Sequence, residues 1–483
     1  MGRYVFTIPD CDRFTGELLM RAQIIGLEGI PWTGQAVIEG NQLVVDRHVE
    51  TSGRLLVPFQ SDHHGPVFLV TATLPEADQP WPLDLELARG SLSRLRNQVA
   101  IWEESGLVIP PAVRRQIDGL ITGCAAALFS ENGQATERTR QCVEVIDQSV
   151  DLMFVVADQY SRQVDELSHQ LQENIPVQCG IVGREDQATR LGLDLVQQFP
   201  EFPAADPRTG KPDVNSLQPV VQWASRPPPG LVRVIGPLLD FGVAELPAWL
   251  DPDATYEQRL AITKSVCQEI GRCFGHDLKL VHALAGISGV GQPRFNYPQQ
   301  LQMSIEILET LDRTLPNTSA LVSFDQPWGE RLATANGGVP AMEIAESLLR
   351  YGARVSALGL EINLGYWPQG TLIRDPLQWV DLIDRWSQFG LPLVVYLSAP
   401  IPGPTALPDN RFARTVCPEC LEPGFADYLA TVLNLLKSRP AVNVILWKFS
   451  DNATNPRFPA SGLLEEPGDA KPGASRLIQI LRG

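Results

Sequence analysis

Short apolar runs, broken by turn residues, follow one another through the first 78 residues. They are separated by Gly, Asn and Asp, and they cover residues 4–8, 35–40, 42–47, 53–59 and 67–74. This spacing is typical of short strands in a small sandwich. We therefore predict an N-terminal β-sandwich-like domain at residues 1–80.

The hydrophobic period changes to that of a helix from about residue 82. Apolar residues fall near one stripe at Leu83, Leu87, Leu92, Leu95 and Val99, and two longer amphipathic segments follow at 112–129 and 136–172. Apolar positions three and four residues apart share one face of a helix. We predict a helical linker layer at residues 81–174.

From residue 175 onward, eight short apolar runs alternate with helical patterns. The runs are 177–183, 193–199, 231–241, 278–286, 319–325, 355–365, 391–399 and 442–450. Such alternation predicts a parallel sheet, and eight units favour a (β/α)8 TIM barrel at residues 175–483, an α/β fold. The alternative is a doubly wound open sheet, but no G-x-G-x-x-G follows the first run, and the glycines of 286–291 have the wrong spacing.

Composition and charge limit the kinds of partner that the protein is expected to bind. The net charge of -17 argues against binding to a nucleic-acid backbone, and no run of apolar residues is long enough for a membrane span. The N-terminus shows no signal-peptide pattern, so we expect a cytoplasmic location. Among eight cysteines only Cys417 and Cys420 form a C-x-x-C, and without a second pair or nearby histidines we expect no metal.

Candidate chemistry gathers where the predicted barrel strands end, because a barrel places its active site at the carboxyl ends of its strands. Carboxylates there could act as general acid and base, and aromatic rings could stack on sugars. We predict three catalytic residues, Glu330, Glu361 and Asp325. The predicted substrate-binding residues are Trp328, Tyr366, Trp367, Trp447, Asp240, Asn363 and Asp451.

Each of these side chains also has a structural interpretation. Trp328 and Trp447 could cap the barrel core. Glu361 could be a buried acid paired with an arginine rather than a residue of the mouth. Asp240 and Asp325 could cap the following helices, and Asp451 could hold its own loop. This structural alternative would be favoured if the acids are dispersed and salt-bridged to Arg374 or Arg354; the acids in question are Glu330, Glu361, Asp325 and Asp240.

Other catalytic sets are missing. The chain has no Walker A loop, no G-x-S-x-G and no H-E-x-x-H, and no histidine follows His282. A Schiff-base lysine would have to be Lys448. We therefore expect no cofactor.

Several segments resemble family 10 glycoside hydrolases, the endo-1,4-β-xylanase family. Residues 220–250 resemble the third-strand region of that family, and 356–365, 389–400 and 439–452 resemble its sixth, seventh and eighth strands. The N-terminal part, with 82–103, 326–330 and 359–375, resembles xylanase-like proteins of planctomycete-type bacteria. The resemblance covers about residues 175–480 and implies a (β/α)8 barrel with retaining β-1,4-glycanase ancestry.

The usual catalytic glutamates of that family are not in place. The family places an Asn-Glu pair at the end of strand four, where this chain has Ala283 and Leu284, and a nucleophilic Glu at the end of strand seven, where it has Leu397 or Ser398. The strand-three histidines are also absent.

Three hypotheses follow. The first is a glycoside hydrolase that uses a relocated pair, Glu330 or Asp325 with Glu361, on a plant-type or endogenous β-glycan or oligosaccharide. The second is an inactive pseudo-enzyme that binds oligosaccharide or polysaccharide. The third is an assembly scaffold, a homo-oligomer joined through the sandwich and the helical layer.

Overall fold

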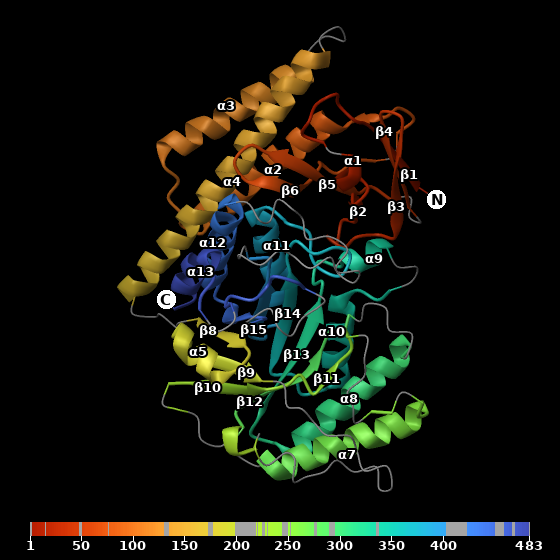
Figure 1. Cartoon of the computed structure of the whole chain (residues 1–483). Helices are drawn as coiled ribbons and strands as arrows, with labels where there is room; N and C mark the ends of the chain where they lie inside the picture. The colour runs from red at the N-terminus through yellow and green to blue at the C-terminus, as the bar shows by residue number, and fades with distance from the viewer. Residues whose placement is uncertain are drawn as a thin grey trace.

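The computed structural model describes residues 2–14, 16–47, 51–75, 77–129, 135–171, 177–198, 219, 221–224, 228, 230–243, 250–251, 253–274, 278–288, 295–334, 338–401, 423–449, 458–465 and 469–482. Small sheets built from the N-terminal segments lie at one end of the molecule. Three helices run beside them, and a large parallel sheet with its helices makes up the rest (Figure 1).

Two small sheets form the N-terminal part. One has the strand order β3-β4-β1-β7 and the other β2-β5-β6. Their strands are β1 (Gly2–Thr7), β2 (Gln23–Ile25), β3 (Gly34–Glu39), β4 (Gln42–Arg47), β5 (Arg54–Ser61), β6 (Gly65–Val70) and β7 (Trp81–Pro82), with the short helix α1 (Gly16–Leu19) between β1 and β2. Alternate residues of β1, Tyr4 and Phe6, are buried because successive side chains of a strand face opposite sides.

Three helices follow: α2 (Leu83–Glu104), α3 (Pro111–Leu128) and α4 (Ala135–Leu171). The predicted stripe of α2 is buried from Leu83 to Val99. Helices α2 and α4 also contact α11 of the barrel, so this layer joins the small sheets to the rest of the molecule.

The remaining strands form a closed parallel barrel, which confirms the predicted (β/α)8 fold. Neighbouring strands pair in chain order, β16 pairs with β8, and β10 pairs with β12 to close the circle. The strands are β8 (Gln178–Val182), β9 (Leu195–Gln198), β10 (Val232–Ile235), β12 (Leu280–Ala285), β13 (Ser319–Asp325), β14 (Ala357–Asn363), β15 (Leu393–Ser398) and β16 (Val442–Trp447), and β11 (Leu239–Asp240) extends the third strand along β12.

Helices follow these strands on the outside of the barrel. They are α5 (Glu185–Leu191), α7 (Tyr256–Phe274), α8 (Tyr297–Thr314), α9 (Glu330–Thr334), α10 (Ala341–Tyr351), α11 (Pro376–Ser387), α12 (Pro423–Lys437), the 3-10 turn η2 (Pro472–Ala474) and α13 (Ser475–Arg482). The start of α11 is fixed by Asp375, whose carboxylate accepts from the backbone N–H of Leu377 at 2.9 Å and of Gln378 at 3.1 Å.

The barrel interior is apolar in its lower layers. Eight buried side chains, one or two from each of six strands, pack together there: Leu195, Val234, Leu321, Ala357, Val394, Tyr396, Val444 and Leu446. Residues between these positions face outward and belong to the large core shared with the helices. The next inward-facing residues toward the carboxyl end of each strand, two or four positions further along, line the mouth.

The N-terminal sheets lie against the loops that follow β13 and β14. The backbone N–H of Phe68 donates to the carbonyl of Ile373 at 2.8 Å, and the Thr33 hydroxyl donates to the carbonyl of Leu332 at 2.9 Å. One side of the barrel mouth is therefore held by segments that are far away in the sequence.

Candidate functional site at the barrel mouth

Glu361 lies at the centre of the polar side chains at the carboxyl end of the barrel. It is on β14 and is buried. Its Oε1 accepts from the Ser323 hydroxyl at 2.6 Å and from the backbone N–H of Gly286 at 3.0 Å, and its Oε2 accepts from Lys448 Nζ. Three donors from three other strand ends therefore fix this carboxylate.

Gly286 allows this close approach. Its φ is +58°, and a Cβ atom placed there would lie 2.7 Å from Oδ1 of Asp240 and 2.5 Å from the backbone nitrogen of Gly242. Only glycine fits such a position without displacing its neighbours. Asp240, a predicted binding residue, is thereby placed beside the loop that donates to Glu361, and its Oδ1 accepts from the Gly242 N–H at 2.7 Å.

A chain of hydrogen bonds continues from Glu361 into the barrel. Ser323 Oγ lies 2.8 Å from His282 Nε2, and Gln197 Nε2 lies 2.9 Å from His282 Nδ1. Tyr396 donates to Gln197 Oε1 at 2.7 Å. Because the Gln197 amide donates to Nδ1, the proton of the neutral ring belongs on Nε2, and it points through Ser323 toward Glu361.

Burial and charge set the protonation of these groups. Burial alone would raise the pKa of Glu361, but the Lys448 ammonium and the hydroxyl of Ser323 together lower it to about 2. Burial lowers the pKa of His282 to about 4, although Glu361 acts in the opposite direction. At neutral pH the site therefore holds an ionised carboxylate beside a neutral imidazole, and Glu361 accepts rather than donates a proton.

Asp325 is the second carboxylate of the mouth. It is the last residue of β13, it is 5% exposed, and it stands in register with Glu361 on the neighbouring strand. Residues in register on adjacent parallel strands point to the same side of a sheet, so both carboxylates face the mouth. Burial lowers the pKa of Arg331, and the nearby Asp325 carboxylate acts in the opposite direction.

The loop after Asp325 is tied to the loop after β14. Gln326 adopts a φ of 46°, which is uncommon for a residue other than glycine. Its side-chain amide donates to the carbonyl of Pro368 at 2.8 Å and to that of Gly370 at 2.6 Å. The two strand ends that carry Asp325 and Glu361 are thus held to each other.

Asn363 lies two residues beyond Glu361 on β14, so it faces the same side. Its Oδ1 accepts from the Ser398 hydroxyl at 2.6 Å, and both side chains are buried. Tyr366 is buried against Phe458, and its hydroxyl donates to the carbonyl of Pro459 at 2.7 Å. Trp367 is half-buried, with the guanidinium carbon of Arg21 5.9 Å from its ring centroid.

Glu330 and Trp328 follow β13, the strand that ends in Asp325, but they lie away from the polar side chains around Glu361. Glu330 begins α9, is 1% exposed, and accepts from Arg374 Nη2 at 3.1 Å. The Trp328 indole packs edge-on against Trp379 and under the Arg374 guanidinium. For Glu330, this is the arrangement that the structural alternative predicts. Of the three residues predicted to be catalytic, Asp325 and Glu361 are the two that lie together at the mouth.

Trp447 points outward from the barrel. It is fully buried, and its indole N–H donates to the carbonyl of Ser461 at 2.8 Å. An enclosed ring offers no face for stacking on a sugar. Asp451 lies outside the described residues, as do Cys417 and Cys420.

Sequence reasoning missed several members of the site. Ser323 and Gln197 were not singled out, and Lys448 was considered only as a Schiff-base lysine. Phe449 was also missed: it is half-buried, and its ring centroid lies 6.0 Å from Lys448 Nζ. One signal was available for Ser323, because it is two residues from Asp325 and positions two apart share a face of a strand.

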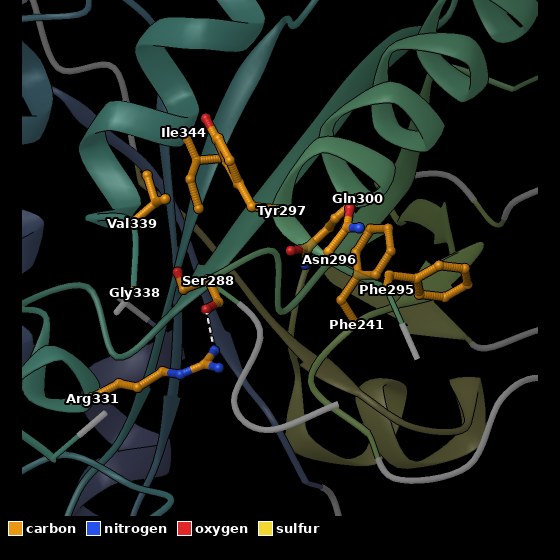
Figure 2. A pocket seen from close by; sticks show the side chains of 10 residues that line it. All are labelled: Phe241, Ser288, Phe295, Asn296, Tyr297, Gln300, Arg331, Gly338, Val339 and Ile344. Carbon is orange, nitrogen blue, oxygen red and sulfur yellow. Dashed lines mark hydrogen bonds between the residues drawn. The ribbon is translucent and has the colours of Figure 1, made fainter. Parts of the chain in front are cut away.

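A cavity of about 340 Å³ lies beside the mouth, next to the ends of the third, fourth and fifth strands. Figure 2 shows Phe241 and Phe295 together on one side of this cavity and Arg331 on the other. Arg331 donates to the carbonyl of Ser288 and so connects the loops after β12 and β13. This cavity adjoins the mouth through Arg331, which also interacts with Asp325.

Two further features bear on the kind of site. Among the described residues, no group of three or more His, Cys, Asp or Glu side chains is arranged to hold a metal ion. Within the same part of the chain, no helix is long and apolar enough to cross a membrane.

The sequence matches no protein-family model, and no curated protein matches it. Solved structures similar to the chain include family 10 xylanases. Native xylanase 10B from Thermotoga maritima is 13% identical over 65% of this chain and 97% of its own, with a TM-score of 0.46. The family 10 enzyme from Paenibacillus barcinonensis is 15% identical over 63% of this chain and 97% of its own, with a TM-score of 0.46.

Proposed function

We propose that this protein binds an oligosaccharide at the mouth of its barrel. One observation carries the proposal: the ionised carboxylate of Glu361 is fixed at the carboxyl end of the barrel, in register with that of Asp325. Fixed carboxylates are acceptors for the hydroxyl groups of a sugar, and hydrogen bonds to charged groups are the stronger ones. Asn363 adds an amide on the same face, and Phe449 adds a half-buried ring for stacking.

Binding without hydrolysis is the form of this proposal that the electrostatics favour. A glycosidase needs one carboxyl group that is protonated before it acts. Lys448 keeps Glu361 ionised, and Glu330 is paired with Arg374 away from the mouth. The strands that carry the two acids of a family 10 enzyme, here β12 and β15, contain no Asp or Glu.

Hydrolysis is the second candidate, and the register of Asp325 with Glu361 favours it. Two carboxylates on neighbouring strands can flank one glycosidic bond. In that case Glu361 would attack the sugar or activate water, and Asp325 would protonate the leaving oxygen. The subgroup within the xylanase-like proteins, the glycan, the cytoplasmic location and the oligomeric state stay predictions from the sequence.

Titration calorimetry with xylo- and gluco-oligosaccharides tests the proposal. We expect saturable binding to the wild-type protein and a loss of affinity of about tenfold or more in Glu361→Gln and Asp325→Asn, because each loses charge-assisted hydrogen bonds. Glu309→Gln is the matched control, since Glu309 is exposed on α8. Far-UV circular dichroism verifies that the variants fold.

The same samples distinguish the two candidates. Release of reducing ends by the wild-type protein that disappears in Glu361→Gln would establish hydrolysis, whereas binding without release would support the binding function. Absence of binding to every oligosaccharide by the wild-type protein would overturn both.

A further inference from the structure

A second cavity, of about 300 Å³, lies between the N-terminal sheets and α11, away from the barrel mouth. Four arginines from three parts of the chain line it: Arg54 on β5, Arg94 on α2, Arg374 before α11 and Arg385 within α11. A convergence of four guanidinium groups is costly unless each charge is balanced. Their partners therefore indicate what the cavity is built to hold.

Two of the four charges are balanced within the protein. Arg94 forms a bidentate ion pair with the buried Asp375: Nη1 donates to Oδ2 at 2.7 Å and Nη2 donates to Oδ1 at 3.1 Å. Arg374 donates to Glu330 at 3.1 Å and to the side chain of Gln378 at 2.9 Å.

Arg54 and Arg385 are not balanced in this way. Among the described residues, no salt bridge joins either guanidinium to a carboxylate, and the buried side-chain Nε of Arg54 has no hydrogen-bond partner. Arg385 donates through Nη1 to the carbonyls of Glu28 at 3.3 Å and Gly29 at 3.0 Å, and through Nε to the carbonyl of Asp381. Its Nη2 therefore has no hydrogen-bond partner in the part of the chain that the structure describes.

Other charged groups lie near both guanidinium groups. Burial lowers the pKa of Arg54, the neighbouring charge of Arg94 lowers it further, and Asp381 acts in the opposite direction. Burial also lowers the pKa of Arg385; Asp381 raises it, while Arg374 and Arg54 lower it. The cavity thus has a cationic side that a bound anion would stabilise.

We propose that this cavity binds a small molecule bearing a phosphate or sulfate group, with Arg54 and Arg385 holding the oxyanion. The planar fork of arginine matches the oxygens of such a group. The volume is at the lower end of small-molecule sites and leaves room for a short organic part beside the anion.

The acids at the rim fit this assignment. Asp384 is paired with Arg439. Asp381 lies 3.7 Å from Arg94, and its charge also acts on Arg54 and Arg385, but neither of these two guanidinium groups forms a salt bridge with it. Glu28 and Asp381 are exposed at the opening, where they can accept from hydroxyl groups of the organic part.

Calorimetric titration with inorganic phosphate, sulfate and glycerol 3-phosphate at constant ionic strength tests the site, with sodium chloride as the reference. We expect saturable binding by the wild-type protein and a loss of affinity of about tenfold or more in Arg54→Gln and in Arg385→Gln. Arg54→Lys keeps the positive charge but loses the planar guanidinium group, so its affinity should lie between that of the wild-type protein and that of Arg54→Gln. If Arg54→Gln does not fold, Arg385→Gln and Arg54→Lys decide the question.

Arg350→Gln is the matched control, because Arg350 is exposed on α10 and forms a salt bridge with Glu346 of the same helix. Tighter binding of glycerol 3-phosphate than of phosphate identifies an organic phosphate as the ligand, and equal binding identifies the free anion. Two results overturn the site: absence of saturable binding to the wild-type protein, or an equal loss in Arg350→Gln. Neither depends on oligosaccharide binding at the mouth.

Discussion

His282 shows how one buried side chain couples the candidate site to stability. Its two ring nitrogens contact Gln197 and Ser323, and no position of the ring is open to water. Such a ring must stay neutral in the folded protein while it can take up a proton when the chain unfolds. The consequence is measurable as a dependence of stability on pH.

We predict that His282 makes the protein less stable as the pH falls from about 6.5 to about 4. Its pKa is lowered from 6.5 to about 4 in the folded state, so the unfolded chain binds more protons in this range. The loss over the window is on the order of 3 kcal/mol. Urea unfolding at several pH values measures it.

The variant His282→Asn should remove this contribution to the slope of the free energy of unfolding against pH, whatever its effect on stability at pH 7. His169→Gln is the control, because His169 is exposed on α4. Equal slopes for the wild-type protein and His282→Asn between pH 6.5 and pH 4.5 would contradict the prediction.

At the scale of elements, α11 is positioned by one buried ion pair. Asp375 caps the helix and is fully buried, and Arg94 of α2 holds both of its oxygens. Removal of the arginine leaves a buried carboxylate without its counter-ion, although the backbone and Gln378 still donate to it.

We therefore predict that Arg94→Met lowers the free energy of unfolding by about 3 kcal/mol or more. The comparison is Arg140→Met, which removes an exposed arginine paired with Glu137 and should lower the free energy of unfolding far less. Urea denaturation of both variants provides the measurement. Similar losses in the two would show that the buried pair does not hold α11 in place.

The barrel strands were predictable from the sequence, but a break within one of them was not, and both results have a physical cause. All eight barrel strands were predicted, because buried parallel strands are near-continuous apolar runs between helical patterns. The interruption of the third strand into β10 and β11 was not predicted, because it depends on how this strand pairs with β12.

At the scale of the whole molecule, the three parts share one core. A single cluster of buried apolar residues runs from Tyr4 in the N-terminal sheets through Leu87 of α2 to Leu481 near the C-terminus. Contacts of Gln378 with Phe68 and of Arg94 with Asp375 cross between the parts.

We accordingly predict that the N-terminal sheets and the barrel unfold together. Thermal unfolding followed by tryptophan fluorescence, by near-ultraviolet and by far-ultraviolet circular dichroism should give one coincident transition. Two resolved transitions would show that the N-terminal part is an independent unit.

The candidate site was predictable in part. Glu361 and Asp325 were placed at the mouth from strand order alone, because a barrel brings the carboxyl ends of its strands together. Trp328 and Glu330 follow β13 in a loop and a short helix, so residue order did not show whether they face the mouth or the helices. Trp447 is the last residue of β16, and its direction depends on which alternate positions of that strand face inward.

The sequence by itself determined the barrel, its eight strands and the edge where its polar side chains gather, since these follow from hydrophobic period and chain order. Only the tertiary structure decided which acid has which partner. Lys448 and Ser323 hold Glu361, Arg374 holds Glu330, and Arg54 lies beside Arg385, 331 positions away. Protonation and pairing depend on distance and burial, and those exist only after segments remote in the sequence have packed together.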